Sequence, residues 1–263
     1  MRWLVALAML DVTGKALAQD NPLFPPLLAD PREPGFFAAY LWSRAPLGSR
    51  LGAVGLGETI GLVRAGDWEV SIEGGVFSQF NMASATNDLI NADYRVGLPV
   101  TYRHGAFASR FQLYHQSSHL GDEYMIHTGA QRANLTFESA ELILSRGVGP
   151  WRAYGGGEYV FEYSPSDLKP GALRAGLEYR GKRPVLNGGR SVAARFVAGL
   201  DVLSVQVRAW QSAWSMVGGL EITTRGSAWR WSVLLKGYSG PMPYGQFYRE
   251  RLSSIGVGIS FTR

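Results

Sequence analysis

One segment of the chain carries an imidazole and a hydroxyl two positions apart, His115 and Ser117. If the segment is a β-strand, these two side chains lie next to each other on one face of the sheet. The same face carries Phe107, Phe111 and Leu113, so we expect it to face lipid. An imidazole beside a hydroxyl, at the depth of a lipid ester, suits lipid-acyl hydrolysis. The alternative is that both residues only anchor the strand at a membrane interface or hydrogen-bond a loop.

Polar residues just beyond this pair are candidates for binding a divalent cation. Carboxylate oxygens are preferred ligands of Ca²⁺. No second carboxylate cluster stands at a fixed spacing from these residues. The sequence therefore favours no cofactor, with Ca²⁺ as the alternative. The candidate ligands are His119, Asp122, Glu123 and His127.

Apolar and polar residues alternate through most of the chain beyond residue 35, strictly so in residues 68–73 and 173–180. This alternation is typical of half-buried strands. We predict an all-β fold of about twelve strands, each about long enough to cross a bilayer at a tilt. The predicted strands cover residues 36–43, 50–64, 67–79, 92–103, 106–116, 133–145, 151–163, 172–180, 191–202, 209–224, 228–238 and 252–262.

Every second connection between these strands is short, whereas the others are mostly longer. Short periplasmic turns alternating with longer extracellular loops are typical of transmembrane antiparallel β-barrels of outer membranes. The ten-residue connection 181–190 is an exception on the short side. An aromatic girdle at the periplasmic end is consistent with this topology. Its predicted members are Phe36, Trp68, Phe107, Trp151, Trp229 and Phe261.

Composition restricts the possible functions. The absence of Cys excludes disulfides, thiol nucleophiles and Cys-ligated metals. The net charge of +5 comes from scattered Arg and Lys residues, which predicts no nucleic-acid partner. Residues 1–18 have the pattern of a signal peptide, and residues 36–263 are the predicted barrel. Between them, the Pro-rich residues 19–35 are expected on the periplasmic side, as a tether or a short plug, with a partner-binding peptide as the alternative.

Charged residues of both signs occupy the strand face opposite to the lipid-facing one. Cross-strand salt bridges between such residues brace a small lumen. Twelve strands enclose less space than the roughly 16–18 strands of water-filled porins. We therefore expect a filled or constricted lumen, with a narrow channel as the alternative. The predicted interior residues include Glu69, Glu73, Arg110, Arg152, Glu158, Glu162, Arg174, Glu178, Arg180, Arg230 and Lys236.

Two segments carry resemblances to bacterial envelope proteins. Residues 254–261 resemble the C-terminal signal of bacterial barrels, which implies the barrel-assembly machinery as a partner, although Thr262 and Arg263 follow the terminal aromatic residue. FPPLLADPREP at 24–34, with SSHLGDEY at 117–124, resembles a Gram-negative family catalogued only as a domain of unknown function. That resemblance implies an envelope location and no particular activity.

Residues 114–118 are similar to the His-x-Ser-Asn stretch of outer-membrane phospholipase A and the lipid A deacylases, which are small barrels with a lipid-facing active site at this rim. The resemblance implies that His115 is the general base and Ser117 the nucleophile. Ser118 stands where those families have Asn, so the residue that orients the base is not identified. Asn134 is a candidate, although its parity directs it toward the lumen.

Two functions therefore remain open for a chain expected in the bacterial outer membrane. One is a serine-type lipid-acyl hydrolase with outer-membrane lipids as its substrates. The other is a non-enzymatic narrow channel or structural envelope barrel.

Overall fold

The computed structural model describes residues 22–44, 47–188 and 192–262. The predicted signal peptide, residues 1–18, lies outside the described residues. The strands are β1 (Phe36–Arg44), β2 (Arg50–Ala65), β3 (Trp68–Asn81), β4 (Leu89–His104), β5 (Phe107–Leu120), β6 (Leu135–Val148), β7 (Trp151–Ser164), β8 (Gly171–Arg180), β9 (Leu186–Gly188), β10 (Val192–Val205), β11 (Gln211–Thr224), β12 (Arg230–Pro241) and β13 (Arg251–Thr262). The helices are α1 (Asp122–Thr128) and the 3₁₀ turns η1 (Gln206–Arg208) and η2 (Gly245–Phe247).

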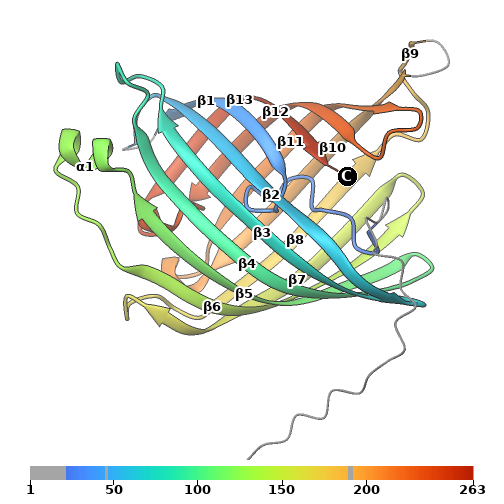
Figure 1. The fold of residues 1–263 in the computed structure, drawn as a ribbon, viewed down its shortest axis with the longest axis horizontal. Coiled ribbons are helices and arrows are strands. Elements are labelled where there is room, and N and C mark those ends of the chain that lie inside the picture. Colours follow the sequence, from blue (N-terminus) through green and yellow to red (C-terminus); the bar gives the residue numbers. More distant parts are fainter. Residues whose placement is uncertain (1–21, 45–46, 189–191, 263) are drawn as a thin grey trace, which may run out of the picture.

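Twelve of these strands form one closed antiparallel barrel (Figure 1). Each strand pairs with its neighbour in sequence, and β13 closes the barrel by pairing with β1, with Phe36 opposite Phe261. The predicted all-β barrel and its strand number are therefore confirmed. The short strand β9 pairs with β10 alone and lies within the exceptional connection 181–190, where we predicted no strand.

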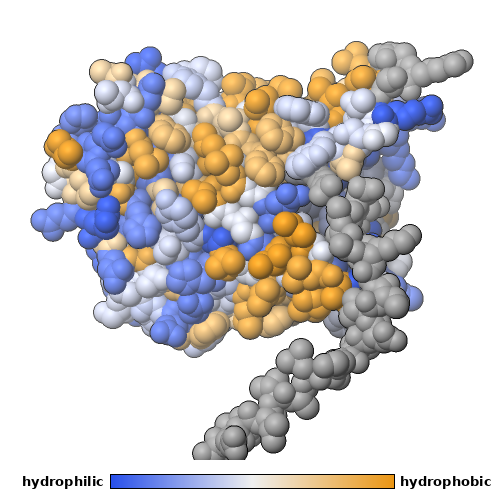
Figure 2. Space-filling model, viewed as in Figure 1, coloured by the Kyte–Doolittle hydropathy of each residue, from blue (hydrophilic) through white to orange (hydrophobic). Residues whose placement is uncertain are grey.

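The outer wall of the barrel is apolar. Leu98, Phe111 and Leu235 remain 54%, 44% and 65% exposed, respectively. Figure 2 shows apolar side chains gathered over the wall and polar ones at the end that carries α1. A closed barrel with an apolar outer surface is adapted to lipid. No helix among the described residues is long and apolar enough to cross a membrane.

Aromatic side chains concentrate at the end with short turns. The rings of Trp68 and Tyr102 are 4.8 Å apart, and those of Trp151 and Tyr179 are 4.9 Å apart. Both pairs join neighbouring strands across a register position. Amphipathic rings of this kind lie at the level of lipid headgroups, so this end of the barrel corresponds to the expected periplasmic girdle.

The Pro-rich segment 22–35 lies inside the barrel and is held by buried arginines. Arg174 contacts Asp30 at 2.6 Å, and Arg110 donates to Glu33 at 2.6 Å. Arg152 donates to the carbonyl of Pro25 at 2.7 Å. A segment without regular structure can be buried only if its backbone polar groups find such partners. We refer to residues 22–35 as the plug.

The charges of the lumen are paired across strands as expected. Arg95 of β4 donates to Glu73 of β3 at 3.0 Å, and both side chains are almost fully buried. Arg180 of β8 contacts Glu221 of β11 at 2.8 Å, over the intervening strand β10. These pairs and the plug fill much of the barrel interior.

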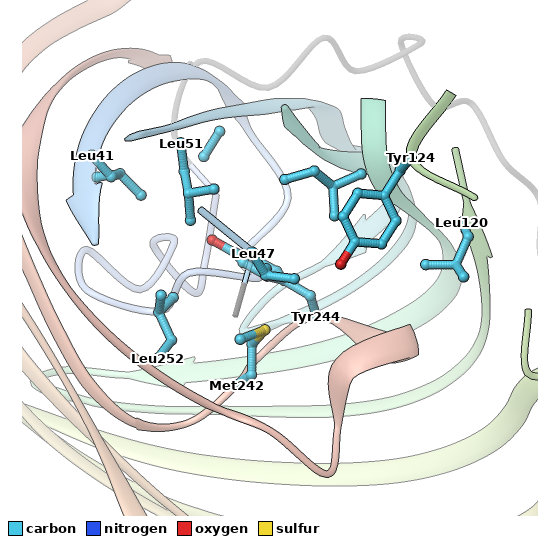
Figure 3. Packing of buried hydrophobic residues seen from close by; sticks show 10 residues of the cluster. Leu41, Leu47, Leu51, Leu120, Tyr124, Met242, Tyr244 and Leu252 are labelled. Carbon is cyan, nitrogen blue, oxygen red and sulfur yellow. The ribbon is translucent and has the colours of Figure 1, made fainter. Parts of the chain in front are cut away.

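Packed apolar side chains fill part of the lumen at the end that carries α1. Leu47, Leu51, Ile90, Tyr244 and Leu252 belong to one buried cluster. Figure 3 shows Leu47 beside Met242 and Tyr244, which come from the connection between β12 and β13. This connection therefore folds inward over the barrel mouth.

The orientation of the barrel gives a testable prediction. A protease site inserted at Asp122, in α1 and 81% exposed, is expected to be cut on intact cells. A site inserted at Gly226, in the short turn after β11, is expected to be cut only after the outer membrane is permeabilised. Immunoblotting of protease-treated cells measures both. The opposite pattern would invert the barrel and remove His115 from the outer leaflet.

Candidate functional site

The site lies on the outer wall at the upper part of β5. The pairing of β5 with β4 and with β6 is continuous, without a bulge. The side chains of β5 therefore alternate as predicted, with Phe111 and Leu113 exposed and Gln116 and Ser118 buried in the lumen. His115 shares the outward face, with 41% of its side chain exposed.

The position of His115 along β5 is close to the rim that we expect on the extracellular side. It stands eight residues beyond Phe107, which lies at the end with the aromatic girdle. At about 3.4 Å per residue, the two are roughly 27 Å apart along the strand. A strand tilt of about 40° reduces this to roughly 21 Å along the membrane normal, near the upper edge of an apolar band about 25 Å tall. His115 and Ser117 therefore lie close to the depth of lipid ester groups.

Glu138 of β6 holds the imidazole. It stands directly opposite His115 in the register, and its Oε1 lies 2.7 Å from His115 Nδ1. Each side chain is about 40% exposed. With Nδ1 donating to this carboxylate, the other ring nitrogen, Nε2, is the one available to accept a proton.

The candidate from the sequence, Asn134, does not take this place. It lies before β6 begins, in an exposed connection, and does not point into the lumen as its parity suggested. Leu135 is buried and Phe137 lines the lumen, so the alternation that they set directs the preceding position, Asn134, outward. Instead, Glu138, which no motif in the sequence singled out, lies beside His115.

A second carboxylate lies beside Glu138. The register of β6 and β7 shifts at this point, because Phe161 is an extra residue on β7. Such a bulge moves the following side chain to the other face of the sheet. Glu162 therefore stands opposite Glu138 and is exposed, so our prediction that Glu162 faces the lumen was wrong. His115, Glu138 and Glu162 form one row across β5, β6 and β7.

Ser117 follows His115 on the same face. It stands opposite Tyr94 of β4 and Thr136 of β6 in the register. Within the described residues its hydroxyl makes no hydrogen bond, including none to His115. The two residues are nonetheless consecutive on one strand face, about 7 Å apart along the backbone, so their side chains can meet.

The neighbouring Ser118 has a different role. Its hydroxyl donates to Asn91 at 3.0 Å and also bonds Asp93, and it accepts from the backbone N–H of Gln246 at 3.0 Å. Asp93 in turn accepts from the backbone N–H of Gly245 at 3.0 Å. Ser118 therefore fastens the connection between β12 and β13 inside the lumen, away from lipid.

The candidate metal ligands do not converge. The His119 ring packs edge-on against Tyr94, whereas Asp122 contacts Arg132 at 3.4 Å. His127 Nδ1 lies 2.7 Å from Asp88 Oδ2. In the connecting loops and strands that the structure describes, no three His, Asp or Glu side chains are grouped to hold a metal ion. The alternative of a Ca²⁺ site at His119, Asp122 and Glu123 thus has no support in the geometry of the described residues.

Hydrogen bonds to Asp88 from Thr86 and His127 hold the pKa of the Asp88 carboxyl below its usual range. This contact ties α1 to the connection between β3 and β4. It stabilises the extracellular end of the barrel and does not reach His115.

Comparison with known proteins supports the fold. Residues 8–262 match the family described as protein of unknown function (DUF1207). Outer membrane phospholipase A from Escherichia coli superimposes with a TM-score of 0.62 at 12% identity, covering 87% of this chain and 90% of that chain. A mutant of that enzyme in which an active-site asparagine is replaced gives a TM-score of 0.61 at 12% identity, covering 93% and 94%.

The Salmonella typhi outer membrane phospholipase dimer with bound calcium gives a TM-score of 0.57 at 12% identity, covering 87% of this chain and 90% of that chain. No curated protein matches the sequence. At these identities the likeness establishes the outer-membrane barrel fold alone.

Proposed function

The chain belongs to the DUF1207 family of proteins of unknown function, and we propose that it is a serine-type lipid-acyl hydrolase of the outer membrane. The observation that carries the proposal is the 2.7 Å contact between His115 Nδ1 and Glu138 Oε1, directly beside Ser117 on the lipid-facing wall. A carboxylate fixes the tautomer of an imidazole, and the imidazole activates a hydroxyl. A carboxylate, an imidazole and a hydroxyl, the groups that take these roles, lie together near the depth of the lipid ester groups.

The reaction follows from these positions. Ser117 Oγ attacks the ester carbonyl carbon, and its proton passes to His115 Nε2. The bond from that carbon to the alcohol oxygen then breaks, and the imidazolium returns the proton to the leaving alcohol. Water attacks the acyl-serine with the same base, releases the fatty acid and restores Ser117. Glu138 keeps Nδ1 protonated throughout and stabilises the imidazolium that forms in each step.

A further likeness supports the role of Glu138. In the Escherichia coli phospholipase an asparagine belongs to the active site. An amide oxygen and a carboxylate oxygen can both accept a hydrogen bond from Nδ1–H. Glu138 in this chain offers a carboxylate oxygen to Nδ1 of His115.

The test is an assay of purified protein refolded into vesicles of phosphatidylethanolamine or of lipid A. Released fatty acids are measured by mass spectrometry, and labelling by a fluorophosphonate reports an activated serine. We expect release from at least one lipid and labelling at Ser117. Release from neither lipid, together with no labelling of Ser117, would favour the second candidate, a structural envelope barrel without activity.

The role of Glu138 gives a second prediction. Glu138→Gln retains an acceptor for Nδ1–H, so we expect hydrolysis within about tenfold of the wild type. Glu138→Ala leaves the imidazole unoriented, and we expect a loss of about 10²-fold or more. Steady-state rates on the same vesicles measure both. Glu162→Ala is the matched control on the next strand, and an equal loss there would contradict a specific role for Glu138.

We also infer that the C-terminal strand is recognised by the barrel-assembly machinery. Phe261 contacts Trp231 with ring centres 4.6 Å apart, and it is the last aromatic residue of the chain. Phe261→Ala is expected to lower the amount of folded protein in the outer membrane several-fold. Heat-modifiable migration of outer-membrane fractions measures it. Phe107→Ala, an aromatic residue of the same rim, is the control and should have a smaller effect.

A further inference from the structure

The lumen at the end that carries α1 is divided into a packed part and an empty part. On one side, Met242 and Tyr244 pack into the buried cluster with Leu47 and Leu252 (Figure 3). On the other side, the same two residues border a cavity of about 120 Å³. We call this space the upper cavity.

The walls of the upper cavity are mostly apolar, although Gln116, Glu158, Lys169 and three tyrosines also line it. Leu135 and Phe137 of β6 face it, as do Leu203 and Val205 of β10 and Ala172 of β8. The space would accommodate roughly eight waters, but these side chains offer them no hydrogen bonds. Apolar stretches of wall hold water weakly and suit hydrocarbon. The walls therefore favour an alkyl chain as the occupant.

Two cations border this space, Lys169 at its exposed mouth and Arg32 at its buried end. Arg32 of the plug reaches the cavity with only 14% of its side chain exposed. Its one ion-pair partner in the described parts of the chain is Glu158, at 3.9 Å, and its guanidinium makes no hydrogen bond there. Glu158 Oε1 already accepts from Ser139 at 2.8 Å and bonds the Tyr114 hydroxyl.

The Arg32 guanidinium is largely buried and makes no hydrogen bond in the described parts of the chain, so its N–H donors remain available to a ligand in the cavity. An Arg offers five N–H donors in a planar fork that matches a carboxylate. Arg32 can therefore bind the carboxylate of an anionic amphiphile. The apolar walls beside Arg32 suit the alkyl chain of the same molecule.

The mouth of the upper cavity is covered by two connected loops. Lys169 and Tyr248 line it, from the β7–β8 and β12–β13 connections. Asp167 accepts from the Tyr248 hydroxyl at 2.8 Å and from Arg249 Nε at 3.0 Å. Hydrogen bonds from Arg249 and Tyr248 hold the pKa of Asp167 below its usual range, so this contact persists in mild acid. These loops lie at the end of the barrel that carries α1, which is where a ligand would enter.

We propose that the upper cavity binds a fatty acid, with its carboxylate on Arg32 and its alkyl chain against β6, β8 and β10. The site is separate from His115 and Ser117, which lie on the outside of the wall. Binding therefore does not depend on hydrolysis, and the protein with Ser117→Ala is expected to bind as well as the wild type.

The test is titration of the full chain in phospholipid nanodiscs with three twelve-carbon probes, using empty nanodiscs as the baseline. Dodecanoate is expected to bind saturably at one per protein, and at least ten times more tightly than dodecanol or dodecyltrimethylammonium. Arg32→Gln is expected to lower dodecanoate affinity at least tenfold. Arg180→Gln, which changes a lumen arginine paired with Glu221, is the matched control and should leave it unchanged.

Ala172→Phe fills the upper cavity and is expected to abolish binding of all three probes. If Arg32→Gln fails to fold, as judged by heat-modifiable migration, Ala172→Phe still tests whether the upper cavity is the binding site. The proposal is overturned by binding no greater than that of empty nanodiscs, by equal affinity for the alcohol and the carboxylate, or by binding that neither variant changes. None of these outcomes depends on whether the outer wall hydrolyses lipids.

Discussion

Ser117→Ala is expected to lower the rate of lipid-acyl hydrolysis by at least about 10³-fold while leaving the barrel folded. The hydroxyl is the only group of the site that can form the acyl bond. It makes no hydrogen bond among the described residues, so its removal leaves no buried partner unsatisfied. The loss should appear in the rate on vesicles and in the fluorophosphonate labelling, with unchanged heat-modifiable migration.

His115→Ala is expected to cause a loss of the same order, and the double variant little more than either. Residues that act as one catalytic unit are not additive in their effects. Independent losses that multiply in the double variant would argue that the two residues do not form a pair.

Ser118→Ala is a poor control for Ser117→Ala, because Ser118 makes structural hydrogen bonds of its own. Its hydroxyl binds Asn91, Asp93 and the backbone of Gln246, so Ser118→Ala is expected to loosen the lumen without touching the lipid face. Ser109 is the better matched control, since it shares the outward face of β5 near the opposite rim. Ser109→Ala should keep full activity. Equal activity of wild type and Ser117→Ala would refute the hydrolase.

The strands and the outward face of β5 were predictable because they depend on local alternation. Residues 110–113 alternate between polar and apolar, and the pairing of β5 has no bulge that could invert the parity of His115. The predicted ranges therefore match the observed strands closely, with β9 as the exception. β9 has three residues and pairs with one strand only, so it leaves too short an apolar–polar alternation to detect.

Glu138 could not be found in the same way. Its position opposite His115 depends on the register of β5 and β6, which are joined by residues 121–134. A connection of this length does not fix a register. Once the structure places Phe107 opposite Arg146, the pairing runs unbroken to His115 and Glu138.

The bulge at Phe161 could not be predicted from the sequence for a related reason. Apolar Val160 and Phe161 precede Glu162, and such a pattern does not say which residue is extra. The shift appears only in the pairing with β6. It matters for the site, because it brings a second carboxylate to the lipid face beside Glu138.

The plug depends on contacts between residues far apart in the sequence. Pro residues made 24–34 recognisable as a segment outside the sheet, but no periodicity shows which lumen arginine each acid meets. Asp30 pairs with Arg174 across 144 positions, and the lumen places Asp201 on the same arginine at 3.1 Å. Such a pairing can be identified only from the three-dimensional structure, in which the closed barrel brings Arg174 and the plug together.

Arg174→Met is expected to destabilise the folded barrel by about 3–5 kcal/mol, because it leaves two buried carboxylates without their cation. Arg174 is 6% exposed, and Asp30 and Asp201 are also buried. Urea titration of the protein in vesicles, followed by Trp fluorescence, measures the change. Arg132→Met removes a cation from the exposed pair with Asp122 and should cost less than about 1 kcal/mol.

A second consequence concerns the plug itself. Without Arg174, Asp30 loses its main contact in the lumen, so residues 22–35 should detach more readily and let ions pass. We expect higher conductance of Arg174→Met in planar bilayers than of the wild type, and partial recovery of stability when Asp30→Asn and Asp201→Asn are added, since the neutral amides no longer need a cation. A variant as stable and as closed as the wild type would show that Arg174 does not hold the plug.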